Sequence, residues 1–409
     1  MLQAASAEAL QLPSGAGPAM LTTMKLDATA PRIDASDART TRRPAMTPGT
    51  GDLSRRALLA STLALAACGK GASADPASSA RNGPVPLLRD LAPFPIGTEI
   101  ITDEFGRPGF DAAASSQFSQ ITAGFEMKME YILQQDGSLR FEGGDRVAAF
   151  CKANDQALHG HTLIWYIDKP AAFQKLVGDK RAFDRAYANY IQAVAGRYKG
   201  LARSWDVVNE PVADDGVSLR ESLWTENLGQ EGHFIRAHEE AHAADPNALL
   251  FVNDYHLESK PHKRRTFLKL IEDMLKRGVK IDGIGTQTHI DIDLPPGKIA
   301  EALRDLASLG LPIHLSELDV SFQTDGVSLK SRADRQANQL RLYREALESF
   351  VALPDKQQFA FTVWGVRDAD SWLRNSSWGK DKTDAPLLFD DMGQPKETFW
   401  TLVDVLQGR

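Results

Sequence analysis

From Phe94 to the end of the chain, short apolar runs alternate with segments in which apolar residues recur every three or four positions. The first pattern is typical of buried parallel strands, and the second is typical of amphipathic helices that cover them. Strands are expected at residues 94–100, 121–127, 158–165, 204–210, 249–255, 283–290, 312–320 and 359–366. Helices are expected between them, for example over residues 182–198, 264–277, 298–309 and 332–350.

Eight strands, each followed by a helix, predict a (β/α)8 barrel that forms a single domain over residues 93–409. The rival fold is a doubly wound open sheet, which would require a glycine-rich phosphate loop after its first strand. The residues at that place, Gly97-Thr98-Glu99, are not such a loop. The barrel is therefore the predicted fold.

The first 92 residues have a different character. Residues 1–45 show no sustained apolar period and are predicted to be disordered or an over-long start. Residues 46–68 resemble a twin-arginine export signal that ends in a lipobox, Leu65-Ala66-Ala67-Cys68, and residues 69–92 are expected to be a flexible linker. We therefore expect an exported protein of the periplasm or cell envelope, attached to the bacterial membrane by a lipid on Cys68. A plain signal peptide with a chance cysteine is the alternative.

Composition excludes several classes of protein. With 43% hydrophobic and 25% charged residues, the chain is neither collagen-like nor fibrous nor disordered as a whole. A formal charge of −7 argues against a nucleic-acid partner, and two cysteines cannot form a disulfide scaffold or a cysteine-based zinc site. We expect no metal, no cofactor and a monomer.

Polar and aromatic residues occur where the predicted strands end. In a barrel of this type the carboxyl ends of the strands form the functional face. Two glutamates stand out there, Glu210 after the fourth strand and Glu317 in the seventh. Paired carboxylates suit the cleavage of a glycosidic bond, because one can protonate the leaving oxygen while the other attacks or activates water.

These residues carry a resemblance to glycoside hydrolase family 10, the endo-β-1,4-xylanase family. The seven matching segments occur in the family order, each at a different predicted strand. They are Glu126-Met127-Lys128, His159 to Trp165 (HGHTLIW), Trp205 to Pro211 (WDVVNEP), Asn253-Asp254-Tyr255, Gly283 to His289 (GIGTQTH), Ser316 to Asp319 (SELD) and Thr362 to Trp372 (TVWGVRDADSW).

The resemblance implies a role for each matching residue. Glu210 would be the general acid/base and Glu317 the nucleophile of a retaining mechanism. Asn209 would hold the 2-hydroxyl of the sugar that is cleaved, His289 would hydrogen-bond Glu317, and Gln287 would lie beside them. The glycone subsites would be lined by Lys128, His161, Trp165, Trp364 and Trp372, and the leaving-group side by Tyr255. Asp206 and Asp319 would support the site, and the His161–Thr162 peptide bond would be cis.

The chain also departs from the family pattern. Where the family commonly has Glu-Asn-x-Met-Lys-Trp, this sequence has Gly124-Phe125-Glu126-Met127-Lys128-Met129. Recognition of the second glycone sugar is therefore expected to be weakened or reshaped. The predicted function is cleavage of β-1,4-xylosidic bonds in xylan or xylo-oligosaccharides. The alternatives are a barrel glycosidase for another β-linked glycan and a non-catalytic glycan-binding surface lipoprotein.

Overall fold

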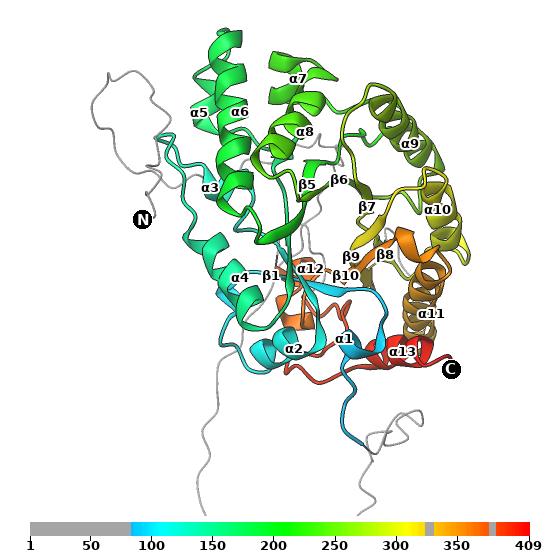
Figure 1. Cartoon of the computed structure of the whole chain (residues 1–409). Helices are drawn as coiled ribbons and strands as arrows, with labels where there is room; N and C mark the ends of the chain where they lie inside the picture. Colours follow the sequence, from blue (N-terminus) through cyan, green and yellow to red (C-terminus); the bar gives the residue numbers. More distant parts are fainter. Residues whose placement is uncertain (1–82, 324–330, 376–381) are drawn as a thin grey trace, which may run out of the picture. The chain divides into compact units, whose positions relative to one another are not determined.

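A closed barrel of parallel strands forms the centre of the molecule (Figure 1). The structure is a computed structural model that describes residues 83–323, 331–375 and 382–409. In these residues the neighbouring strands follow the order β10-β1-β2-β3-β5-β6-β7-β9, and β9 pairs with β10 to close the sheet. The bounds of these strands are Ile96–Ile100 (β1), Gln120–Ala123 (β2), Ala157–Gly160 (β3), Ala202–Asn209 (β5), Leu249–Asp254 (β6), Gly283–Thr286 (β7), Ile313–Ser321 (β9) and Gln358–Val363 (β10). The predicted (β/α)8 barrel is confirmed, because a doubly wound sheet would leave two open edges.

Two of the predicted strands are interrupted near the carboxyl face. After β3 the chain breaks and resumes as β4 (Ile164–Trp165), which pairs with β5. The hydroxyl of Thr162 and the backbone N–H of Leu163 both donate to the carbonyl of Asp206, at 2.8 and 3.0 Å, and this fixes the break. The His161–Thr162 peptide bond within it is cis, as the resemblance predicts. In the same way β7 resumes as β8 (His289–Asp291), which pairs with β9.

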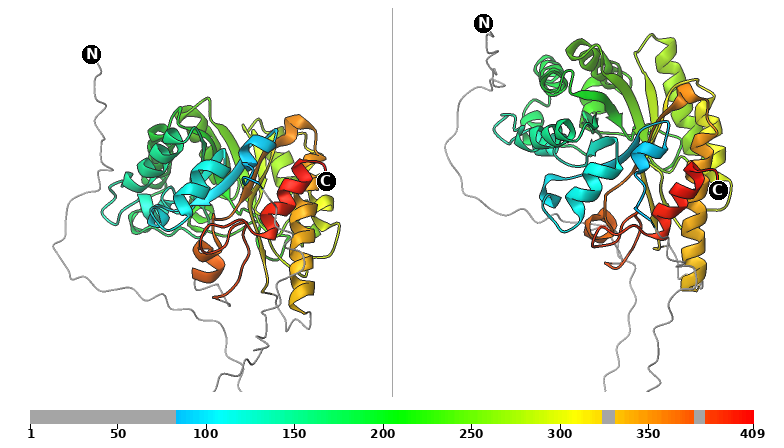
Figure 2. Two further views of the ribbon diagram at one scale, coloured as in Figure 1. Left: turned by 90° about the horizontal axis from the view of Figure 1, so that it is seen from below. Right: turned by 60° about the horizontal axis from the view of Figure 1, so that its bottom comes forward.

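Helices surround the barrel (Figures 1 and 2). The longer helices are α2 (Phe110–Gln117), α4 (Glu142–Ala153), α6 (Lys180–Arg197), α8 (Gly232–Ala244), α9 (Pro261–Lys276), α10 (Lys298–Ala307), α11 (Arg332–Val351) and α13 (Glu397–Leu406). The shorter helices are α1 (Leu88–Leu91), α3 (Met129–Ile132), α5 (Ala171–Gln174), α7 (Leu223–Leu228) and α12 (Trp372–Asn375), with 3-10 turns at Thr102–Glu104, Asp355–Gln357 and Asp368–Asp370. In the described part of the chain, no helix combines the length and apolarity that a membrane span requires.

The four predicted helices are present, and their ends follow from local chemistry. The helix predicted from residue 264 begins at Pro261, because proline suits the first helical turn, where its missing N–H would be unpaired anyway. The helix predicted at residue 332 begins there, and Ser331 caps it by accepting from the backbone N–H of Asp334.

The start of the ordered domain differs from the prediction. Leu88–Leu91, expected to be part of the linker, form α1. Leu88 is fully buried, and its backbone N–H donates to the side chain of Gln117 at 3.0 Å. Packing of one apolar residue thus extends the domain below residue 93. The predicted export signal, Cys68 and residues 69–82 of the predicted linker lie outside the described residues.

The inside of the barrel becomes more polar towards the carboxyl face. At the amino end Phe251 packs on Phe359, with ring centroids 4.4 Å apart. In the next layer the rings of His159 and His314 lie 4.7 Å apart, and His314 Nε2 contacts the hydroxyl of Thr362 at 2.7 Å. Barrels of this type are commonly filled by branched aliphatic side chains. Here a column of polar groups leads from the middle of the barrel to its rim.

Glycine is required in β7 by the close approach of Phe251. A Cβ at Gly283 would lie 2.2 Å from the Phe251 ring, which is fully buried and cannot withdraw. Gly283→Ala is therefore expected to lower the free energy of unfolding by about 1–3 kcal/mol, measured by urea denaturation. Gly196 in α6 is the matched control, because a Cβ there meets nothing within 4 Å. Gly196→Ala should instead raise the free energy of unfolding by about 0.5–1 kcal/mol. Equal effects of both substitutions would contradict this account of the core.

Candidate active site

The predicted catalytic glutamates lie on one rim of the barrel. Glu210 directly follows β5, and Glu317 lies within β9. Both are largely buried, with 8% and 4% of their surfaces exposed. They share a layer of amide side chains supplied by β5, β6 and the end of β7, so residues far apart in the sequence form one connected polar site.

Glu317 accepts hydrogen bonds on both of its carboxylate oxygens. Asn253 Nδ2 donates to Oε1 at 2.7 Å, and His289 Nε2 donates to Oε2 at 3.1 Å. Burial alone would raise the pKa of Glu317. The hydrogen bond from His289 and the neighbouring His161 outweigh burial, so the pKa of Glu317 lies below its ordinary value. Glu317 is therefore ionised at neutral pH.

His289 is held between two carboxylates. Its Nδ1 donates to Asp319 Oδ2 at 2.9 Å, while its Nε2 donates to Glu317. Burial opposes a charge on the ring, but Asp319 and Glu317 together overcome this and raise the pKa of His289 to about 10. The imidazole is therefore a cation with both N–H groups in use, which fixes its orientation and its donation to Glu317.

Glu210 has a different set of contacts. Its Oε1 accepts from Gln287 Nε2 at 3.0 Å and from Asn209 Nδ2 at 3.3 Å, and both donors are uncharged amides. Its backbone has a left-handed φ of 57°, and its N–H donates to the carbonyl of Asn253 at 2.7 Å. A non-glycine residue in this region is uncommon and is often found at functional sites. The turn places the carboxyl group over the barrel opening instead of inside the wall.

Asn253 is a site residue that the sequence analysis did not assign. Its Nδ2 lies 3.1 Å from Asn209 Oδ1 as well as 2.7 Å from Glu317 Oε1, and its own Oδ1 accepts from Ser316 at 2.8 Å. Asn253 therefore connects the Asn209–Glu210 segment to Glu317. Its position directly before a strand end, in a segment that the resemblance already contained, was the available signal.

The residues predicted for the glycone side gather around the same rim. The ammonium of Lys128 lies over the ring of Trp165, 5.0 Å from its centroid. Trp364 meets the rings of His161 and His289 edge to face, with centroids 5.4 and 6.0 Å away. The indole N–H of Trp372 donates to Asp319 Oδ2 at 2.7 Å. Trp372 is thereby coupled to the carboxylate that orients His289.

His161 lies between Trp364 on the glycone side and the buried carboxylate of Asp206. It is 2% exposed, and its Nδ1 contacts Asp206 Oδ2 at 2.8 Å. The same oxygen lies 3.0 Å from His159 Nε2. Burial would raise the pKa of Asp206, but these two histidines hold it below its ordinary value. Both histidines of the His159-Gly160-His161 segment thus contact one buried carboxylate, that of Asp206.

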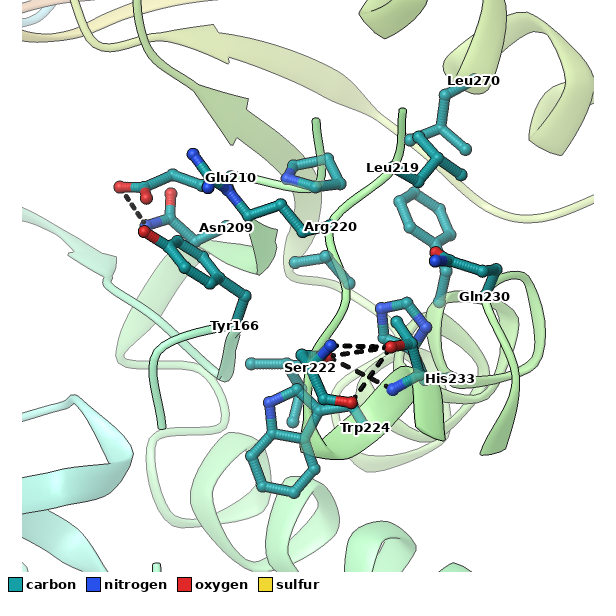
Figure 3. Close-up of a pocket in the computed structure, with 15 residues that line it drawn as sticks. Tyr166, Asn209, Glu210, Leu219, Arg220, Ser222, Trp224, Gln230, His233 and Leu270 are labelled. Atoms are coloured by element: carbon teal, nitrogen blue, oxygen red, sulfur yellow. Dashed lines mark hydrogen bonds between the residues drawn. The ribbon is translucent and has the colours of Figure 1, made fainter. Parts of the chain in front are cut away.

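Tyr255, predicted for the leaving-group side, lies within a cluster around Arg220. Its hydroxyl donates to Asp214 at 2.5 Å and accepts from Arg220. The guanidinium of Arg220 also stacks on Tyr166, 4.0 Å from the ring centroid. Figure 3 shows Tyr166 and Arg220 beside Glu210, at one end of a pocket that extends to His233 of α8. The sequence analysis did not single out Arg220 or Asp214, because both follow the strand in a loop.

Comparison with known proteins identifies the family. The model of glycosyl hydrolase family 10 matches residues 91–405. The chain belongs to this family. It is 32% identical over 352 residues to endo-1,4-beta-xylanase A of Cellvibrio japonicus (strain Ueda107), covering 79% of this chain and 57% of that relative. It is also 32% identical over 343 residues to a thermostable celloxylanase of Thermoclostridium stercorarium, covering 76% and 84%. This chain therefore spans little more than half of the Cellvibrio relative.

Solved structures of the family agree with the fold. A thermostable mutant of a xylanase (Xyn10A) from Cellvibrio japonicus superposes with a TM-score of 0.71 at 31% sequence identity. The match covers 78% of this chain and 100% of that chain. This chain is thus a member of family 10 whose barrel corresponds to the whole of a solved relative.

The contacts of Asn253 predict a change in the pH profile of glycoside hydrolysis. Asn253→Ala removes a donor that favours the ionised form of Glu317, so the pKa of Glu317 rises. The acidic limb of kcat/KM should then move to higher pH by about 0.5–1 unit. Ser316→Ala is the control. It removes the hydroxyl that donates to Asn253 Oδ1 but leaves the bond from Asn253 Nδ2 to Glu317 in place. An unmoved acidic limb in Asn253→Ala would show that this bond does not set the ionisation of Glu317.

Proposed function

We propose that the protein is a retaining glycoside hydrolase that cleaves β-1,4-xylosidic bonds in xylan or xylo-oligosaccharides. The observation that supports it best is the contrast between two carboxyl groups on one rim. Glu317 accepts from a cationic histidine that keeps it ionised, whereas the donors to Glu210 are neutral amides. Unequal environments of this kind separate a nucleophile from a general acid.

We propose that the reaction follows the steps of a double displacement. Glu317 attacks the anomeric carbon while Glu210 donates a proton to the leaving oxygen, which breaks the glycosidic bond. Glu210, now ionised, removes a proton from water, and the hydroxide that forms displaces Glu317 from the sugar. Asn209 hydrogen-bonds the 2-hydroxyl of the sugar, and Gln287 holds the carboxyl group of Glu210 in place. Trp364 and Trp372 offer flat apolar faces to the sugar rings.

The substrate class rests on the relatives. Both curated relatives carry xylan-cleaving names, and one is called a celloxylanase, which makes a β-1,4-glucan the second candidate. A glycan-binding protein without activity is less well supported, because binding alone does not require a carboxylate held ionised by a histidine cation. Release of reducing sugar from xylan, compared with carboxymethyl-cellulose, distinguishes the three functions.

Substitution of the two glutamates tests the proposed mechanism. Glu317→Gln should lower kcat by about 10³-fold or more on every substrate, because an amide cannot act as the nucleophile. Glu210→Ala should retain activity on dinitrophenyl glycosides, whose leaving group needs no proton, and lose it on xylan. The carboxyl groups should lie about 5–5.5 Å apart in a crystal structure, and the first product seen by NMR should have the β configuration. An α product, or a separation near 9 Å, would sink the retaining assignment.

We also propose that recognition of the second glycone sugar differs from that of typical relatives. Gly124 has no side chain to hydrogen-bond a sugar, and Phe125, which is 42% exposed, offers only an apolar face packed edge-on against Tyr131. Restoring the family pattern directly is prevented by space. A Cβ at Gly124 would lie 1.7 Å from Glu99 Oε1. The subsite is thus reshaped around a different side chain.

For cellular location we propose export and attachment to the bacterial envelope through a lipid on Cys68. The proposal is supported by the paired arginines and by the apolar run before Leu65-Ala66-Ala67-Cys68. Several acyl chains on one cysteine would hold the protein stably, whereas one chain binds only marginally.

Cys68→Ser tests the anchor. The native protein should fractionate with membranes, and mass spectrometry of its N-terminus should show a lipid-modified cysteine. The Cys68→Ser form should be released as soluble protein. Cys151 is the internal control, because it is a buried cysteine of α4 and Cys151→Ser should leave fractionation unchanged. Membrane fractionation that persists in Cys68→Ser would count against the lipid.

A further inference from the structure

Glu99 of β1 points into the barrel, on the side where the substrate would lie. Two residues earlier, a Cβ at Gly97 would lie 2.4 Å from the hydroxyl of Thr362, which belongs to the inner polar column. Side chains two apart in a strand share a face, so Glu99 also faces inward, one layer nearer the carboxyl end. Its Oε2 lies 3.8 Å from a Cβ built on Gly365, the neighbour of Trp364.

The carboxyl group of Glu99 fills the space that a side chain at position 124 would use. Glu99 is paired with Thr122 in the register of β1 and β2, and Gly124 lies two residues further on the same face. A Cβ on Gly124 would lie 1.7 Å from Glu99 Oε1 and 2.5 Å from its carboxyl carbon. A side chain at 124 and the Glu99 carboxyl therefore exclude each other.

Glu99 differs from the other acidic residues around it. Asp370 is paired with Arg107 and Arg367, and Glu104 accepts from the backbone N–H of Ile101 at 3.2 Å. Glu126 accepts from the backbone N–H of Thr102 at 2.5 Å. In the described residues, no hydrogen bond or ion pair is formed by the carboxyl group of Glu99, although the residue is only 9% exposed.

The carboxyl group of Glu99, buried and without a hydrogen-bond partner in the described part of the chain, is suited to binding a neutral polar ligand. Burial is the largest influence on Glu99, and with Glu126, Asp370 and Glu317 it raises the pKa to about 8 against the opposing charge of Lys128. At neutral pH the carboxyl is therefore largely protonated, and it can both donate to and accept from a hydroxyl. The carboxyl oxygens of Glu99 are not completely enclosed by the protein, so a ligand hydroxyl can reach them and supply the missing partner.

We propose that the Glu99 carboxyl hydrogen-bonds a hydroxyl of the second glycone sugar, in place of the side chain that is absent at Gly124. This rests on the proposed function, because it assumes a β-linked glycan in the cleft. Glu99 is then a specificity-determining residue supplied by β1, and the subsite keeps a carboxyl group that reaches the sugar from a neighbouring strand.

The test compares two substrates that differ by one glycone sugar, nitrophenyl β-xyloside and nitrophenyl β-xylobioside. The measured quantity is kcat/KM for the xylobioside divided by kcat/KM for the xyloside. The contribution of the catalytic glutamates cancels in this ratio. Glu99→Ala should lower this ratio roughly tenfold, the effect of one lost hydrogen bond. Glu99→Gln should keep most of it, because an amide also donates and accepts. An unchanged ratio in Glu99→Ala overturns the proposal.

A double substitution that moves the carboxyl group from position 99 to position 124 provides a second test. Glu99→Ala opens the space beside Gly124, so Glu99→Ala combined with Gly124→Glu should recover much of the lost ratio. Gly124→Glu alone should lower the melting temperature through the clash. Glu104→Gln is the control, since it changes a neighbouring carboxyl that already has a backbone partner, and the ratio should stay the same. Circular dichroism and melting temperature show that each variant is folded.

The outcomes separate this proposal from the proposed function. If the xylosides are not cleaved but nitrophenyl glucoside and cellobioside are, the substrate assignment fails and the same ratio is measured on the second pair. If neither pair is cleaved, calorimetric titration with xylotriose and cellotriose compares the parent with Glu99→Ala. Weaker binding of a trisaccharide by the variant supports a role for Glu99. Equal binding, or no binding by either protein, overturns it.

Discussion

An ionised carboxylate inside a protein requires donors that replace water, and the rim of this barrel is organised around that requirement. Glu317 is supplied by Asn253 on one oxygen and by His289 on the other. Each donor is itself held by another group, since Ser316 donates to Asn253 and Asp319 accepts from His289. Because these groups come from different strands, the donors to Glu317 come together only when the barrel closes.

The space for this polar arrangement comes from glycines on the inner face of the sheet. A Cβ at Gly285 would lie 2.4 Å from Asn253 Oδ1, and one at Gly283 would lie 2.2 Å from the ring of Phe251. The barrel therefore accommodates large or polar side chains on one strand by reducing the adjacent strand to backbone. Gly124 beside Glu99 follows the same rule at the rim.

The sequence was sufficient for the fold because strand periodicity and strand-end polarity both reflect local chemistry. Glu210, Glu317 and His289 could be found because each lies in or directly after a predicted strand, where a polar residue contradicts the apolar pattern. Arg220 was missed because it lies in a loop, where polar residues are expected and give no contrast. The importance of Glu99 was missed for another reason. The role of Glu99 depends on the absence of a side chain at Gly124, which lies after the neighbouring strand β2. No pattern within β1 alone reveals that β2 is this neighbour.

Asp319 Oδ2 receives two donors, the ring of His289 and the indole of Trp372. An acceptor shared in this way makes ligand binding and protonation reciprocal. Any sugar that draws the Trp372 indole away from Asp319 leaves that oxygen more available to His289 and strengthens the hold of the imidazole on its proton. By the same thermodynamic identity, a proton on His289 alters the affinity for that sugar. A sugar bound at Trp372 thus affects the protonation of His289, and through His289 the charge environment of Glu317. The effect passes through one oxygen atom of Asp319, without movement of the barrel.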